Sequence, residues 1–315
     1  MSAPSRAAIV LAVLVAMLCG AGIAAQARIN GDLGKQLGDG VFAALISFGV
    51  GLVIVAVIVV IAPTGRRGLR RVVGALVERE IPWWYVAGGA AGAFLVASQG
   101  LVASIVGVAL FSVAIVAGQT VGGLVIDARG LGAMTPKPVT PQRLVGSVLA
   151  LVVVVTSASA QVRADVPVLL LILPLLAGFG IGWQQAVNGQ VREISGSAIT
   201  ATFINFVVGT TVLLVATLVH IAFFGWPASF PTDPVLYLGG VVGVLFIAGA
   251  AVIVRVTGVL LLGLGTIAGQ LFASVLLDLF LPVEGHTLSV ATVVGAALTL
   301  VAVGIAAIPR RRAGT

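Results

Sequence analysis

Two pairs of carboxamide side chains in this sequence have the type and spacing needed to hold a polar molecule. Gln26 and Asn30 are four residues apart, as are Gln184 and Asn188, so each pair lies on one face of a helix. Carboxamides both donate and accept hydrogen bonds, and they do so without the desolvation cost of an ion. The two pairs are therefore candidate substrate-binding residues.

Six further residues extend this candidate set. Trp183 and Gln185 flank the second pair and have no counterpart beside the first, so they could fix the orientation of one ligand. The other four are a second pair of glutamines and two acids at the ends of apolar runs, namely Gln119, Gln270, Asp127 and Asp278. We expect substrate binding from the glutamines and coupling or gating from the acids.

Each candidate also has a structural alternative. An Asn-Gly step at a helix end is a common cap, and Gln can bond to a carbonyl of a neighbouring helix. The "AGQ" contexts of Gln119 and Gln270 favour close helix packing, and Asp127 and Asp278 could simply be solvated at a membrane interface. These alternatives stay open from the sequence.

Other chemistry is not indicated. His220 and His286 are isolated in the sequence, and no metal-ligand cluster or phosphate-binding loop occurs. None of the ten acids lies in the middle of an apolar run, where a proton-carrying carboxylate would be expected. We therefore predict no cofactor, no metal and no enzymatic activity.

The elements that position these residues must be membrane helices. Hydrophobic residues make up 60% of the 315 residues, only 9% are charged, and the mean hydropathy is +1.22. Soluble domains carry about 25% charged residues. The Lys and Arg residues behind the net charge of +7 lie between apolar runs, which indicates membrane topology and not nucleic-acid binding.

Runs long enough to cross a bilayer, about 20 residues, predict ten spans. They fall at residues 7–27, 41–62, 83–103, 104–126, 143–160, 167–187, 198–224, 235–254, 256–280 and 288–308. With both termini inside, 14 of the 17 Lys and Arg residues lie on the cytoplasmic side. Residues 1–27 resemble a signal peptide, but we expect them to be retained, because their polar end recurs in mid-chain.

That recurrence is an internal repeat. Residues 22–51 align with 180–209 at an offset of 158, matching Gln26 with Gln184 and Asn30 with Asn188. A later block, residues 88–127, aligns with 239–278 at an offset of 151. Each copy has five predicted spans, an odd number, so the second must be inverted in the membrane. We predict an all-α polytopic membrane protein with repeats at 1–160 and 161–315.

This pattern resembles the drug/metabolite transporter superfamily. The "GIxxQxxxNGxL" motif at residue 22 and the "GQ" followed by Asp at residues 118–127 are similar to the YdcZ-type family of inner-membrane exporters, in a fused two-repeat form. The resemblance implies an inner-membrane exporter, and the inverted repeats predict alternating access. We expect the substrate to be a small polar or amphipathic molecule, and the lipid bilayer and a second copy of the chain to be the other partners. The alternative is a membrane scaffold whose polar residues only join helices.

Overall fold

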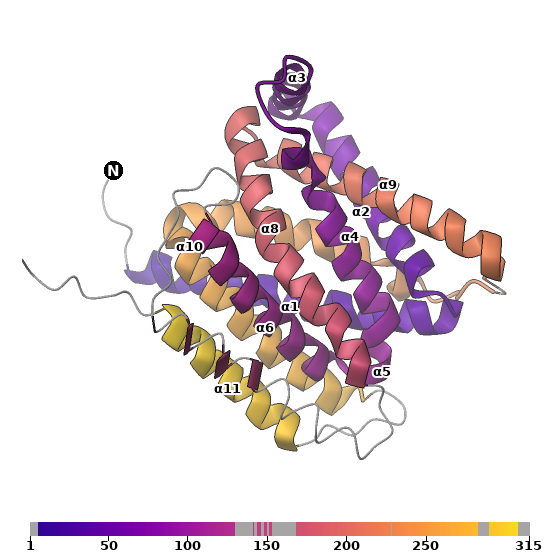
Figure 1. The fold of residues 1–315 in the computed structure, drawn as a ribbon, viewed down its shortest axis with the longest axis vertical. Helices are drawn as coiled ribbons and strands as arrows, with labels where there is room; N and C mark the ends of the chain where they lie inside the picture. Colours follow the sequence, from indigo (N-terminus) through magenta and orange to yellow (C-terminus); the bar gives the residue numbers. More distant parts are fainter. Residues whose placement is uncertain are drawn as a thin grey trace, which may run out of the picture.

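In the computed structural model of the chain, the described residues form a bundle of helices (Figure 1). They are residues 6–129, 141, 144–145, 148–149, 151–152, 168–227, 229–282 and 290–307. Within them all regular structure is helical. The span predicted at 143–160 and the residue His286 lie largely or wholly outside them.

The first half contains α1 (Arg6–Leu37), α2 (Gly40–Ile61), α3 (Pro63–Val77), η1 (Trp83–Gly88), α4 (Gly89–Ser98), the π-helix η2 (Gln99–Ala103), α5 (Ser104–Val106) and α6 (Val108–Arg129). The second half contains η4 (Val168–Leu171), α8 (Ile172–Ser195), α9 (Ala198–Phe224), η5 (Pro234–Tyr237), α10 (Gly239–Phe280) and α11 (Val290–Ala307).

Five helical segments of the described chain are long and apolar enough to cross a membrane. They are Gly40–Ile61, Trp83–Val106, Val108–Ile126, Leu169–Ser195 and Ala198–Phe224. Their exposed faces carry large hydrophobic side chains, as expected for helices that face lipid and not water. The described part of the chain is thus all-helical, with the apolar helices of a membrane protein.

The repeat found in the sequence is visible in the turns. Gly38 follows α1 and Gly196 follows α8, with φ angles of +68° and +66° that favour glycine. The next residues, Asp39 and Ser197, cap the following helices by accepting hydrogen bonds from backbone amides of their first turns. The two copies therefore use the same turn between their first and second helices.

The 42-residue helix α10 doubles back on itself. Gln26 of α1 bonds to the carbonyl of Gly239 at its start, while Arg28 bonds to the carbonyl of Leu281 just past its end. A straight helix of that length would separate these two carbonyls by about 60 Å. Because Gln26 and Arg28 are neighbours, α10 must reverse direction between its two ends.

The sequence predicts separate spans at 235–254 and 256–280, joined at Arg255, where the structure has a single helical element. The reversal of direction within α10 agrees with two antiparallel spans, although residues 239–280 form one helical element. Contacts of α1 with residues 239–246 and again with residues 266–281 define two arms, which we call the first and second arms of α10.

The two repeats are packed across one another. A Cβ on Gly20 of α1 would overlap the backbone of Thr266 in the second arm of α10, and one on Gly178 of α8 would overlap Ile115 of α6. Both pairs are related by the repeat offsets of 158 and 151. The first helix of each repeat thus lies against the fourth helix of the other.

Helix α3 lies outside the predicted spans, at one end of the molecule (Figure 1). Its buried residues include Gly68 and Val72, and a Cβ on Gly68 would press on Thr200 of α9. Its outer face carries four exposed arginines, Arg66, Arg67, Arg70 and Arg71. Such an amphipathic helix is suited to the headgroup region of a bilayer.

Candidate substrate site between the two repeats

The first carboxamide pair is buried and bonded to other helices. Gln26 Nε2 donates to the carbonyl of Gly239 at 2.9 Å, and Asn30 Nδ2 donates to Gln99 Oε1 at 2.7 Å. Asn30 and Gln99 are both 0% exposed. We call these two residues, with Gln26 and Ser47 of α2, the first polar cluster.

The second carboxamide pair converges on one residue of α9. Gln184 Nε2 and Asn188 Nδ2 both donate to Asn205 Oδ1, at 2.8 and 3.1 Å. Asn205 is the repeat counterpart of Ser47, at the offset of 158. We call Gln184, Asn188 and Asn205 the second polar cluster; its two donors are half-buried.

Glycines of the opposite repeat make room for both clusters. A Cβ on Gly239 would overlap Asn30 Oδ1 and lie 2.9 Å from Ser47 Oγ, and one on Gly243 would lie 2.7 Å from Gln26 Nε2. These distances are shorter than van der Waals contact, so any larger residue would displace the polar side chains.

The matching glycines serve the second cluster in the same way. A Cβ on Gly88 would lie 3.0 Å from Asn188 Oδ1, and one on Gly92 would lie 2.7 Å from Gln184 Nε2. Gly88 and Gly92 correspond to Gly239 and Gly243 at the offset of 151. Each carboxamide pair therefore faces the third helix of the other repeat.

The two clusters are neighbours. The rings of Phe48 and Phe206, which directly follow Ser47 and Asn205, lie 5.1 Å apart between α2 and α9. A Cβ on Gly92 would contact both Gln184 of the second cluster and the ring of Phe48. The site is thus a pair of polar clusters at the junction of the repeats, separated by two phenylalanines.

Three polar atoms of the first cluster have no hydrogen-bond partner. They are Asn30 Oδ1, Ser47 Oγ and Gln99 Nε2. Leaving a buried polar group unpaired costs about 1–3 kcal/mol. The first cluster therefore contains two acceptors, one of which is also a hydroxyl donor, and an amide donor that are buried and unpaired in this conformation.

The other predicted substrate-binding residues belong to neither polar cluster. Trp183 is half-buried and Gln185 is exposed on α8, so Gln185 does not share the buried environment of its neighbours. Gln270 is buried and Gln119 half-buried, and their backbone nitrogens lie at the close approaches of Gly20 and Gly178. This geometry fits the packing alternative for both glutamines.

Capping is wrong as an account of Asn30 and Asn188. Helix α1 continues from Asn30 to Leu37, and α8 continues from Asn188 to Ser195, so neither residue is at a helix end. Their bonds to Gln99 and Asn205 correspond to the helix-to-helix alternative in this conformation.

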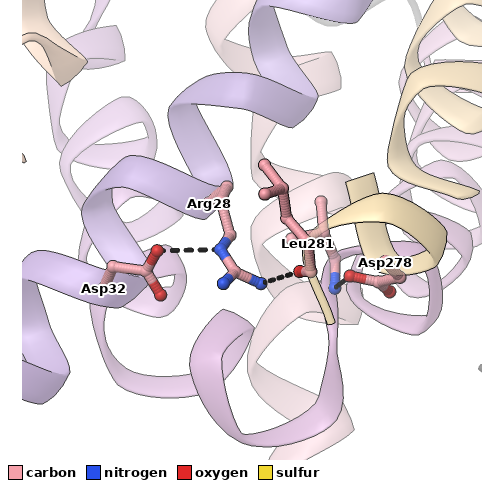
Figure 2. A network of polar contacts seen from close by, with 5 residues as sticks. Arg28, Asp32, Asp278 and Leu281 are labelled. Atoms are coloured by element: carbon pink, nitrogen blue, oxygen red, sulfur yellow. Dashed lines mark hydrogen bonds and ion pairs between the residues drawn. The ribbon is translucent and has the colours of Figure 1, made fainter. Parts of the chain in front are cut away.

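Asp278 is buried, so the expectation of simple interfacial solvation is wrong for it. Its carboxylate accepts hydrogen bonds from the backbone amides of Val108 at 3.0 Å and Ala109 at 2.7 Å, the first residues of α6. Figure 2 shows Asp278 near Arg28 and Leu281. Beside it, Arg28 bridges Asp32 and the carbonyl of Leu281. The side chain of Asp127 lies outside the described part of the chain.

Sequence reasoning missed several polar partners. Gln99 and Asn205 are the only carboxamides in the apolar runs 83–103 and 198–224, which is the signal that could have found them. His220 has no polar partner near it in the sequence, but in the structure its Nδ1 lies 2.7 Å from Asp39 Oδ2. This contact joins the end of α9 to the residue that caps α2. The two residues are 181 positions apart, so the sequence gives no sign of the contact.

A family model described as "Putative inner membrane exporter, YdcZ" matches residues 11–156 and 169–305. The chain belongs to this family. The two matched segments cover both repeats, in agreement with the fused two-repeat form expected from the motifs. No curated protein matches the chain.

One solved structure, titled "Crystal structure of protein", is similar in fold. It is 17% identical, covers 96% of this chain and 97% of its own, and superposes with a TM-score of 0.51. At that identity the similarity supports the fold alone. The exporter assignment therefore depends on the family match.

Proposed function

We propose that this chain is a secondary transporter that exports a small polar or amphipathic molecule by alternating access. The observation that carries the proposal is the crossed arrangement of the two polar clusters. Each carboxamide pair belongs to one repeat and faces glycines of the other. Movement of one repeat against the other would therefore open the site that both repeats build.

The chemistry of the clusters favours an uncharged ligand. The described residues that form them are carboxamides and one serine, without an acid, a base or a histidine. An ion moved into such surroundings would keep no compensating charge. A neutral molecule with at least one donor and one acceptor could instead form hydrogen bonds with the unpaired atoms Asn30 Oδ1 and Gln99 Nε2.

Ligand-dependent thermal stabilisation of the purified protein tests this proposal first. A ligand that binds the folded state raises its stability by about 2.7 kcal/mol at a concentration 100 times Kd. We expect neutral hydrogen-bonding metabolites to raise the Tm of the wild type, and the effect to be lost in Asn30→Ala. Gln185→Ala, an exposed carboxamide on α8, is the matched control and should keep it.

Flux into proteoliposomes then separates a transporter from a scaffold. Stabilising ligands should be transported by the wild type and by Gln185→Ala, and not by Asn30→Ala. If no metabolite of the panel is transported, and Asn30→Ala lowers only the stability of the protein, the result would contradict transport and favour the scaffold.

A further inference from the structure

The outer face of α3 carries both positive charge and apolar side chains, and no other described part of the protein covers it. Arg66, Arg70, Val73 and Val77 follow the spacing i, i+4, i+7 and i+11, which places them on one side of the helix. The arginines are exposed, and the two valines are 50% and 77% exposed. The buried residues of α3, among them Gly68, lie on the opposite side.

The positive charge of this face is not balanced by acids. Residues 63–80 contain five arginines and two glutamates, which gives a net charge of +3. Among the residues that the structure describes, none of the four exposed arginines of α3 forms an ion pair. Arg66 and Arg67 each donate one hydrogen bond, to a backbone carbonyl. Because a guanidinium has five N–H donors, most of them are available to an anion.

The place of α3 in the chain determines which anion it meets. Pro63 directly follows α2, whose last residue, Ile61, is 72% exposed, and Trp83, which is 74% exposed, begins the next segment long enough to cross a membrane. Helix α3 is therefore held between the ends of two such segments, at the level where interfacial Trp side chains and lipid headgroups lie. Charges attract there over about 8 Å at physiological ionic strength.

The second repeat has different chemistry at the corresponding place. At the offset of 158, Arg66 corresponds to Phe224, and the segment between α9 and η5, residues 225–233, contains no Lys or Arg. It exposes Trp226 and Phe230 instead. Of these two segments, only the one that contains α3 has the charge to attract an anionic surface.

We propose that the outer face of α3 is a docking surface for anionic phospholipids. The guanidinium groups of Arg66 and Arg70 pair with the phosphate groups of the lipids, as Arg does with oxyanions in general. Val73 and Val77 lie beside them at the boundary between headgroups and acyl chains, where exposed apolar side chains are favourable.

Helix α3 also connects this surface to the second repeat. Thr200, in the first turn of α9, donates to the carbonyl of Gly65 at 3.1 Å. A Cβ on Gly196, in the turn between α8 and α9, would lie 3.2 Å from Arg71 Nη1. Lipid that holds α3 in place should therefore stabilise a contact between the repeats, and the stability of the folded protein reports on lipid binding.

Thermal unfolding of the full-length protein in detergent, with short-chain phosphatidylglycerol added, tests the surface. We expect the lipid to raise the Tm of the wild type. Its affinity should fall more than about 10-fold in the variant Arg66→Gln/Arg67→Gln/Arg70→Gln/Arg71→Gln, since each arginine near an anionic surface contributes about 5-fold. Lys at the same four positions keeps the charge and should keep most of the effect. Arg129→Gln, at an exposed arginine of α6, is the matched control and should keep all of it.

Three results would overturn the surface. They are equal stabilisation by phosphatidylcholine, equal stabilisation by inorganic phosphate, and a loss in the Lys variant as large as that in the Gln variant. If the Gln variant does not fold, the wild type decides. Raising the salt concentration from about 0.1 M to about 1 M shortens the Debye length from about 10 to about 3 Å. The phosphatidylglycerol effect must then weaken, and an effect independent of salt would contradict docking by charge.

A fluorescent probe extends the test to bilayers. In a Cys19→Ser background, Val77→Cys carries an environment-sensitive dye on the outer face of α3, and Thr232→Cys carries it at an exposed position before η5. In nanodiscs, phosphatidylglycerol should shift the emission of the Val77→Cys probe to shorter wavelength than phosphatidylcholine does, and should leave the Thr232→Cys probe unchanged. The same emission from Val77→Cys in both lipids would contradict docking.

Discussion

At the scale of single residues, the strongest constraint is that Asn30 and Gln99 are fully buried and bonded to each other. Asn30→Ala removes the donor to Gln99 Oε1, so we expect a loss of about 1–3 kcal/mol in the free energy of unfolding. Thermal unfolding in detergent measures this loss as a lower Tm. The exposed residue Gln185, replaced by Ala, should stay within about 0.5 kcal/mol of the wild type.

A double-mutant cycle separates this bond from other effects of truncation. Gln99→Leu in the Asn30→Ala background removes the orphaned carboxamide, so the double variant should be more stable than the sum of the single changes predicts. Additive losses would show that the two side chains are not energetically coupled, in contradiction to the 2.7 Å bond between them.

At the scale of helices, packing depends on where glycines meet the opposite repeat. On α6, a Cβ at Gly118 would overlap the backbone of Leu175, whereas one at Gly123 would meet nothing within 4 Å. We expect Gly118→Ala to lower the Tm or the yield of folded protein. Gly123→Ala should be neutral or stabilising, because Ala exceeds Gly in helix propensity by about 1 kcal/mol. Equal effects of the two changes would refute the close contact between α6 and α8.

The sequence predicts the bounds of some helices better than those of others. The predicted spans 41–62 and 198–224 agree closely with α2 and α9, because long apolar runs end there at charged or turn residues. The predicted span 7–27 covers only part of its helix, since α1 runs on to Leu37. The polar residues of α1 remain helical because other helices supply their hydrogen-bond partners. Hydropathy along the sequence does not detect such partners.

The candidate site was predicted in part for the same reason. The repeat identified Gln26, Asn30, Gln184 and Asn188, because equal spacing in both copies is visible in one sequence. Which residues they bond to could not be read there: Gln99 is 69 residues from Asn30 and has no carboxamide at its repeat position. Contacts across repeats depend on tertiary packing, and one sequence contains only local spacing.

At the scale of the whole molecule, the crossed packing predicts that neither repeat is stable alone. The first helix of each copy fills the space between the third and fourth helices of the other, so an isolated first half would lose the bond from Gln26 to the carbonyl of Gly239 and expose this carboxamide. Exposed carboxamides in hydrocarbon are unfavourable because their hydrogen bonds are lost. Residues 1–160 and 161–315, produced from separate genes in one cell, should therefore copurify as a folded complex.

Each half expressed by itself should be degraded or aggregated, and the coexpressed pair should unfold in one cooperative transition, as measured by thermal denaturation in detergent. Gly20→Ala in the first half weakens its contact with α10 of the second, so it should reduce copurification, whereas Gly49→Ala, where a Cβ meets nothing within 4 Å, should not. A first half that folds without its partner would mean that the repeats are separate domains. In that case, motion between them would not be transmitted through shared helix contacts, and the two polar clusters could not open as one site.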